Sequence, residues 1–185
     1  MAKIALFLAD GCEEIEALTQ ADILRRARMD VDILSIMDTE NVITSHNIHV
    51  KADGMIGDAD FSKYDGIILP GGLKGTENLK KHPIVRKEVQ EFFDAGKLVA
   101  AICAGPTVLG DVGILKGKRA TCYPGCEEGL IGAEVIKSAP AVRDGNIITA
   151  RGVGASISFG LQILEYFEGE EAAKKMAEKI IYRIY

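Results

Sequence analysis

Residues 97–109 read KLVAAICAGPTVL, and this stretch decides the fold. Residues 97–103, KLVAAIC, form a run that ends on Cys103 and is typical of a strand buried on both faces of a parallel sheet. Ala-Gly-Pro follows at once, and a second apolar pattern begins in PTVL. The stretch therefore predicts a strand that turns sharply into a helix, with Cys103 placed at the turn.

The rest of the chain repeats this alternation of apolar runs with amphipathic stretches. Strands are expected at 3–9, 31–36 and 64–72, hairpins at 41–53 and at Asp144-Gly145 within 141–151, and helices over 13–29, from Pro83 to Gly96, over 155–169 and over 170–185. Strands separated by helices in this order imply a doubly wound α/β domain with a mostly parallel sheet and helices on both faces. We expect one domain, residues 1–185.

Composition narrows the classes of function. The 185 residues are 48% hydrophobic and 26% charged, with a net charge of −5, which argues against nucleic-acid and anionic-membrane partners. The N-terminal apolar run is too short for a signal peptide or a membrane helix, so the sequence predicts a cytoplasmic protein. Its four cysteines are then expected to be reduced thiols.

Ligands of doubly wound sheets bind beyond the carboxyl ends of the strands. One such end carries Cys103, where the dipole and free N–H groups of the next helix favour a thiolate and predict a lowered pKa. The alternative is a buried structural cysteine. A second end carries Gly71 and Gly72, which could expose amides for an oxyanion or simply form a turn.

A third strand end leads into the helix expected over 13–29, where Ile15, Leu18, Ala21 and Leu24 recur at helical spacing. Three glutamates crowd its start: Glu13, Glu14 and Glu16. Glu16 shares a side with Gln20 and Ile23 and lies about 200° from Glu14, so one of the two should point inward. An inward carboxyl beside the thiolate would have a raised pKa and could shuttle protons.

Five segments together carry a family resemblance: GCEEIEA, ILPGGLKGTENL, AAICAGPTVL, ATCYPGCE and TARGVGAS. In order and separation they resemble the ThiJ/PfpI superfamily, most closely its Parkinson-disease-protein branch of deglycase and glyoxalase III enzymes. The resemblance implies a flavodoxin-like three-layer sandwich, similar to class I glutamine amidotransferases. It also implies a homodimer with the active site near the interface.

The resemblance assigns roles to four residues. Cys103 matches the nucleophile, Glu16 the buried glutamic acid, and Gly72 and Ala104 the oxyanion-hole amides. Tyr123 stands where the branch often has histidine, so that histidine's role does not transfer. His46 falls where the family can place a polar residue near the dimer contact.

The expected function is that of a cofactor-free cysteine enzyme acting on α-oxoaldehydes such as methylglyoxal, or on their protein adducts, in carbonyl and oxidative stress defence. The alternative is a redox sensor or chaperone that uses an oxidisable Cys103 without significant turnover. Peptidase and amidotransferase activities are disfavoured, because the PfpI protease pattern has histidine where Ala104 stands and the chain offers no other recognisable catalytic histidine. No metal is expected, since Cys122 and Cys126 are four residues apart without further ligands nearby.

Overall fold

The computed structural model describes residues 1–182, which fold around a seven-stranded sheet. The strand order is β10-β11-β7-β6-β1-β2-β5, and every neighbouring pair is parallel except β10 with β11. The strands are β1 (Lys3–Leu8), β2 (Asp30–Ser35), β5 (Gly54–Met55), β6 (Gly66–Leu69), β7 (Leu98–Ile102), β10 (Ala141–Asp144) and β11 (Ile147–Ala150). The strand expected at 97–103 forms over Leu98–Ile102 as β7, a central strand paired with β6 and β11.

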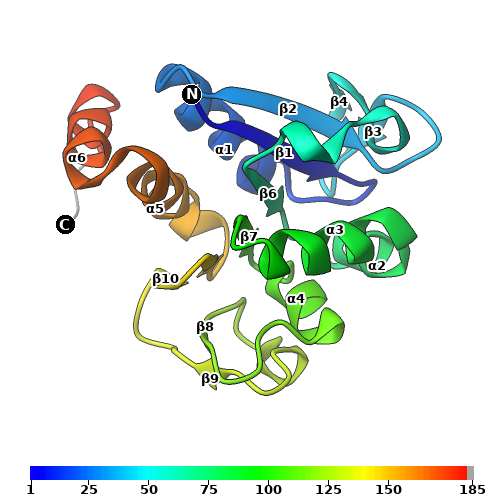
Figure 1. Cartoon of the computed structure of the whole chain (residues 1–185). Coiled ribbons are helices and arrows are strands. Elements are labelled where there is room, and N and C mark those ends of the chain that lie inside the picture. The colour runs from blue at the N-terminus through cyan, green and yellow to red at the C-terminus, as the bar shows by residue number, and fades with distance from the viewer. Residues whose placement is uncertain (183–185) are drawn as a thin grey trace.

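Helices cover both faces of this sheet (Figure 1). On one face lie α1 (Glu14–Arg26), α5 (Ser156–Glu168) and α6 (Glu170–Lys179); on the other lie α2 (Leu73–Lys81), α3 (Pro83–Asp94) and α4 (Pro106–Val112). Strand β1 serves both layers, because Leu6 packs with the first set and Phe7 with the second. The predicted flavodoxin-like α/β sandwich is confirmed.

Both predicted hairpins form. Strands β3 (Asn41–Ile43) and β4 (His49–Lys51) pair antiparallel around Asn47, and β10 pairs with β11 around Asp144-Gly145. A short parallel pair, β8 (Arg119–Ala120) and β9 (Glu134–Val135), was not predicted. Single helical turns complete the chain at η1 (Ile56–Asp58), η2 (Phe61–Lys63), η3 (Glu127–Gly129) and η4 (Val153–Ala155).

Two helices differ from the sequence prediction. Helix α2 was missed, because its nine residues carry an interior Gly75 and only Gly75, Thr76 and Leu79 are buried. Helix α6 ends at Lys179, and Ile181 has a φ of 57°. The rest of the helix expected over 170–185 includes residues 183–185, which lie outside the described residues.

The buried face of α1 is also rotated from the one that the spacing suggested. Ala21 and Leu24 are buried, whereas Ile15 is 48% and Leu18 is 37% exposed. Glu16 and Gln20 take the inward positions instead. The spacing of apolar residues therefore predicted the wrong buried face for this helix. Two large apolar side chains on the predicted face are exposed to solvent.

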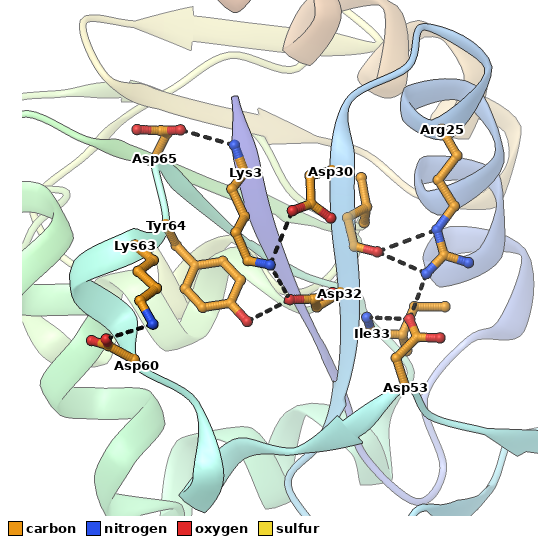
Figure 2. Close-up of polar contacts among 11 residues, drawn as sticks. Lys3, Arg25, Asp30, Asp32, Ile33, Asp53, Asp60, Lys63, Tyr64 and Asp65 are labelled. Atoms are coloured by element: carbon orange, nitrogen blue, oxygen red, sulfur yellow. Dashed lines mark hydrogen bonds and ion pairs between the residues drawn. The ribbon is translucent and has the colours of Figure 1, made fainter. Parts of the chain in front are cut away.

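The amino ends of β1 and β2 are held by a polar network (Figure 2). The Lys3 amino group lies 2.8 Å from Asp32 and 3.0 Å from Asp30, and the Tyr64 hydroxyl donates to Asp32 at 2.6 Å. Arg25 of α1 bonds Asp53 and the Val31 carbonyl in the same region. This network lies at the end of the sheet opposite Cys103, so it anchors the sheet without entering the site.

None of the helices in residues 1–182 combines the length and the apolar character needed to cross a membrane.

Candidate active site

Cys103 lies at a strained turn between β7 and α4. Its φ is +64°, in the left-handed region that a side chain other than glycine rarely adopts. Two main-chain bonds hold it there: its N–H donates to the Ala150 carbonyl at 2.9 Å, and its carbonyl accepts from the Tyr123 N–H at 2.8 Å. Strain of this kind persists where the surroundings enforce it, and it concentrates at functional sites.

The glycine pair after β6 lets the Cys103 side chain approach the backbone. A Cβ on Gly71 would lie 2.5 Å from the Cys103 Cβ and 2.6 Å from Glu16 Oε2, closer than atoms can come. Gly72 has a φ of +84°, and a Cβ there would lie 2.3 Å from the Gly11 carbonyl oxygen. The segment is therefore a close-packed wall of the site as well as a turn.

Glu16 reaches the same point from the buried face of α1. The residue is 0% exposed, and its Oε2 accepts a hydrogen bond from the Gly71 N–H at 3.0 Å. Its Oε1 is buried without a hydrogen-bond partner among the described residues. Burial raises the pKa of Glu16 to about 7, although hydrogen bonds from Cys103 and Gly71 oppose the rise. Glu16 is therefore the carboxyl that enters the core, whereas Glu14, although only 8% exposed, is covered by the β3–β4 turn, where the Ser45 hydroxyl donates to it.

The prediction of a lowered thiol pKa is wrong. Burial, followed by the charge of Glu16 and a hydrogen bond with it, raises the pKa of Cys103 to about 12, while the amides of Gly72 and Ala104 act to lower it. Loss of solvation at the thiol thus outweighs the effect of the two amides on its pKa. Protonation of Glu16 removes the charge that opposes the thiolate, so the two groups titrate as a pair.

All four predicted site residues line one cavity of about 870 Å³, next to the carboxyl ends of β6 and β7. Cys103 and Glu16 meet there, and the main-chain amides of Gly72 and Ala104 act on the Cys103 sulfur. A nucleophile, a titrating carboxyl and two amide donors are the parts needed for covalent attack on a carbonyl carbon.

A sequence model of the DJ-1/PfpI family matches residues 2–166. The chain belongs to the DJ-1/PfpI family. It is 35% identical over 181 residues to the Danio rerio Parkinson disease protein 7 homolog, covering 96% of each chain. It is also 33% identical to the Schizosaccharomyces pombe protein named glutathione-independent glyoxalase DJ-1, covering 89% of this chain and 91% of that one. The predicted relationship to the Parkinson-disease-protein branch is confirmed.

A longer relative and a solved structure also resemble this chain. The Arabidopsis thaliana protein DJ-1 homolog B is 36% identical over 98% of this chain, which spans 42% of that protein's length. The structure titled "Toxoplasma gondii DJ-1, oxidized" superposes with a TM-score of 0.94 at 34% identity, covering 100% of both chains.

Two residues whose roles the family pattern did not predict also line the cavity, His46 and Tyr123. His46, from the turn between β3 and β4, places its Nδ1 2.8 Å from Glu14 Oε1 and 3.2 Å from Glu13 Oε1. Tyr123 is 52% exposed. A histidine in the branch pattern is thus replaced here by a phenol ring at the cavity wall.

Sequence reasoning missed a third wall of the cavity, formed by Arg151, Gly152 and Val153 directly after β11. The available signal was the strand end at Arg151, where the hairpin expected within 141–151 finishes. In the structure β11 is parallel to β7, so this end lies beside Cys103. Arg151 donates from Nη1 to the Lys137 carbonyl at 2.6 Å, so it is held at the rim.

One group of described side chains has ligand atoms close enough for a metal: Glu13, Glu14 and His46, within 4.8 Å of one another. The contacts of His46 Nδ1 with the two carboxylates account for this spacing.

Proposed function

We propose that the chain is a cofactor-independent cysteine enzyme of the glyoxalase III or deglycase type, acting on α-oxoaldehydes such as methylglyoxal or on their protein adducts, in carbonyl and oxidative stress defence. The observation that carries this proposal is the buried carboxyl of Glu16, whose pKa is about 7, held against the Cys103 thiol. A group that titrates near neutral pH both accepts and returns protons efficiently. The name of the fission-yeast relative supports the same class of reaction.

The proposed reaction oxidises one carbon of the substrate and reduces its neighbour, so it needs no added oxidant. The Cys103 sulfur adds to the aldehyde carbon while Glu16 accepts the thiol proton, and the amides of Gly72 and Ala104 stabilise the developing oxyanion. Glu16 returns this proton to the oxyanion, which gives a hemithioacetal and frees the carboxylate. The carboxylate then carries the hydrogen of the former aldehyde carbon, as a proton, to the neighbouring ketone carbon, while the hydroxyl proton passes to the ketone oxygen. This shift oxidises the first carbon to a thioester and reduces the second to an alcohol. Water then hydrolyses the thioester, releasing a hydroxy acid and the thiol.

The test is lactate formation from methylglyoxal by purified, chelator-treated protein without glutathione, followed by proton NMR. We expect steady turnover, because thiol, carboxyl and amides suffice. Loss of the aldehyde signal is not counted, since any thiol adds reversibly to an aldehyde. If no lactate forms while low peroxide converts Cys103 stepwise to sulfinate, the protein is the redox sensor or chaperone, and the enzyme proposal fails.

Peptidase and amidotransferase chemistry fits the site less well. His46 is the one histidine among the described residues that lines the cavity, and its Nδ1 is bonded to Glu14 and not to Cys103.

The four cysteines are free, which suits a reducing compartment such as the cytoplasm.

We also propose that the chain forms a homodimer, as the family resemblance implies. Leu18 of α1 lines an exposed groove with Ile157 and Ile181, and Leu18 and Ile181 are 37% and 78% exposed. Apolar side chains gathered in this way indicate a surface that a partner covers. A second copy of the chain is the partner proposed.

Light scattering after gel filtration tests the dimer. We expect wild type at twice the 19.9 kDa chain mass and Leu18→Glu near the single mass, because a charge in an apolar interface is poorly solvated. Ile131→Glu is the control, since Ile131 is 59% exposed and outside the groove. Wild type at the single mass, or an unchanged dimer in Leu18→Glu, would refute the proposed interface.

A further inference from the structure

Three large apolar side chains lie exposed around the Cys103 cavity: Leu73 (75%), Tyr123 (52%) and Val153 (41%). We call them the apolar rim. They come from three separate segments, the start of α2, the loop after β8 and the turn η4. Solvent-exposed apolar side chains that converge on one cavity mark a surface that binds an apolar group.

The apolar rim surrounds the reactive sulfur. Leu73 directly follows Gly72, whose main-chain N–H hydrogen bonds to the Cys103 sulfur. The Tyr123 N–H donates to the Cys103 carbonyl at 2.8 Å. A Cβ on Gly152 would lie 3.2 Å from Tyr123 Cδ2, so the ring lies close to bare backbone just before Val153. A substrate attacked by Cys103 therefore has these side chains within reach of its substituent.

The cavity is far larger than methylglyoxal. Five non-hydrogen atoms, at about the volume of one water each, occupy roughly 150 Å³, against a cavity of about 870 Å³. Among the charged side chains of the wall, His46 is paired with Glu14, and Arg151 is held in place by one hydrogen bond to the Lys137 carbonyl. The exposed apolar side chains of the same wall add apolar contact and an aromatic face, which methylglyoxal is too small to use fully.

We propose that the apolar rim selects α-oxoaldehydes with an aromatic or bulky apolar substituent, which stacks on the Tyr123 ring while Cys103 attacks the aldehyde carbon. This inference rests on the proposed function and names its substrate class. Contact between the Tyr123 ring and the substituent determines which substrate is preferred. The reaction of Cys103 with the aldehyde carbon is the same for every substrate.

The test compares kcat/KM for phenylglyoxal, measured as mandelate formed, with that for methylglyoxal, measured as lactate formed. We expect Tyr123→Ala to lower the phenylglyoxal-to-methylglyoxal ratio about tenfold, because the ring contact is lost. Tyr123→Phe should keep the wild-type ratio, since it keeps the ring. Ile131→Ala, which removes an exposed apolar side chain outside the cavity, is the matched control and should change neither rate.

Initial rates are taken with the intact mass monitored, because phenylglyoxal also modifies arginine and Arg151 lines the cavity. If both products form but the ratio is unchanged in Tyr123→Ala, or falls equally in Tyr123→Phe, the inference is wrong and the proposed function stands. If neither product forms in wild type, the proposed function fails and this inference fails with it. Leu73→Ala provides a second variant, which should lower the same ratio if Tyr123→Ala does not fold.

Discussion

Replacing Cys103 with serine should abolish lactate formation from methylglyoxal, with a loss of about 1,000-fold or more. The serine hydroxyl is a far weaker nucleophile, and the Glu16 carboxyl, with a pKa of about 7, cannot ionise an alcohol as it assists a thiol. The measurement is lactate by proton NMR at matched protein concentration, with thermal unfolding used to show that the variant folds.

Cys126→Ser is the matched control for the Cys103 variant. Cys126 is also a free, partly exposed cysteine, but it does not line the cavity, so its replacement should leave turnover near wild type. Retention of more than a tenth of the activity in Cys103→Ser would show that the reaction does not pass through this sulfur. Equal losses in both variants would point to general damage from cysteine replacement.

Replacing Glu16 with glutamine should lower turnover about 100-fold or more while the chain stays folded. The amide retains the shape and can still accept from the Gly71 N–H, but it cannot take a proton from Cys103 or from the substrate. In wild type, kcat should rise with pH through about 7 as Glu16 ionises, and this rise should be absent from the residual activity of Glu16→Gln.

Glu88→Gln is the control, because Glu88 is also buried but lies on α3 outside the cavity. It should keep both the rate and its pH dependence. A wild-type rise in kcat that persists in Glu16→Gln would assign the titration to another group.

The same substitution should change how stability depends on pH. The folded-state pKa of Glu16, about 7, lies above the unfolded value of about 4.3, so the folded protein binds this proton more tightly. This tighter proton binding contributes about 3 kcal/mol to the free energy of unfolding. The contribution is fully present below the unfolded pKa, and it is lost as pH rises through the folded pKa of about 7. The stability of wild type relative to Glu16→Gln, from urea unfolding at pH 4.5 and 8, should fall by that amount, and a constant difference would contradict the buried, raised pKa.

The sequence alone was sufficient for the parts of this protein that depend on local pattern. An apolar run followed by small residues and a proline favours a strand that turns at once into a helix. This pattern predicts the β7–α4 connection and places Cys103 at the carboxyl end of the strand. Helical geometry likewise places Glu14 and Glu16 on different sides of α1, so only one of them can enter the core. Glu16 was then chosen by family resemblance, and burial agrees with that choice.

Only the tertiary structure decided what surrounds these residues. The pKa of Cys103 depends on how much water the neighbouring segments exclude and on where the Glu16 charge lies, and neither is encoded by the helix start beside it. The exposed positions of Ile15 and Leu18 depend on how α1 packs against α5 and the sheet. The apolar rim joins residues 73, 123 and 153, which are far apart along the chain. Leu73 and Val153 meet because they follow β6 and β11, the two neighbours of β7. Tyr123 joins them because its N–H donates to the Cys103 carbonyl.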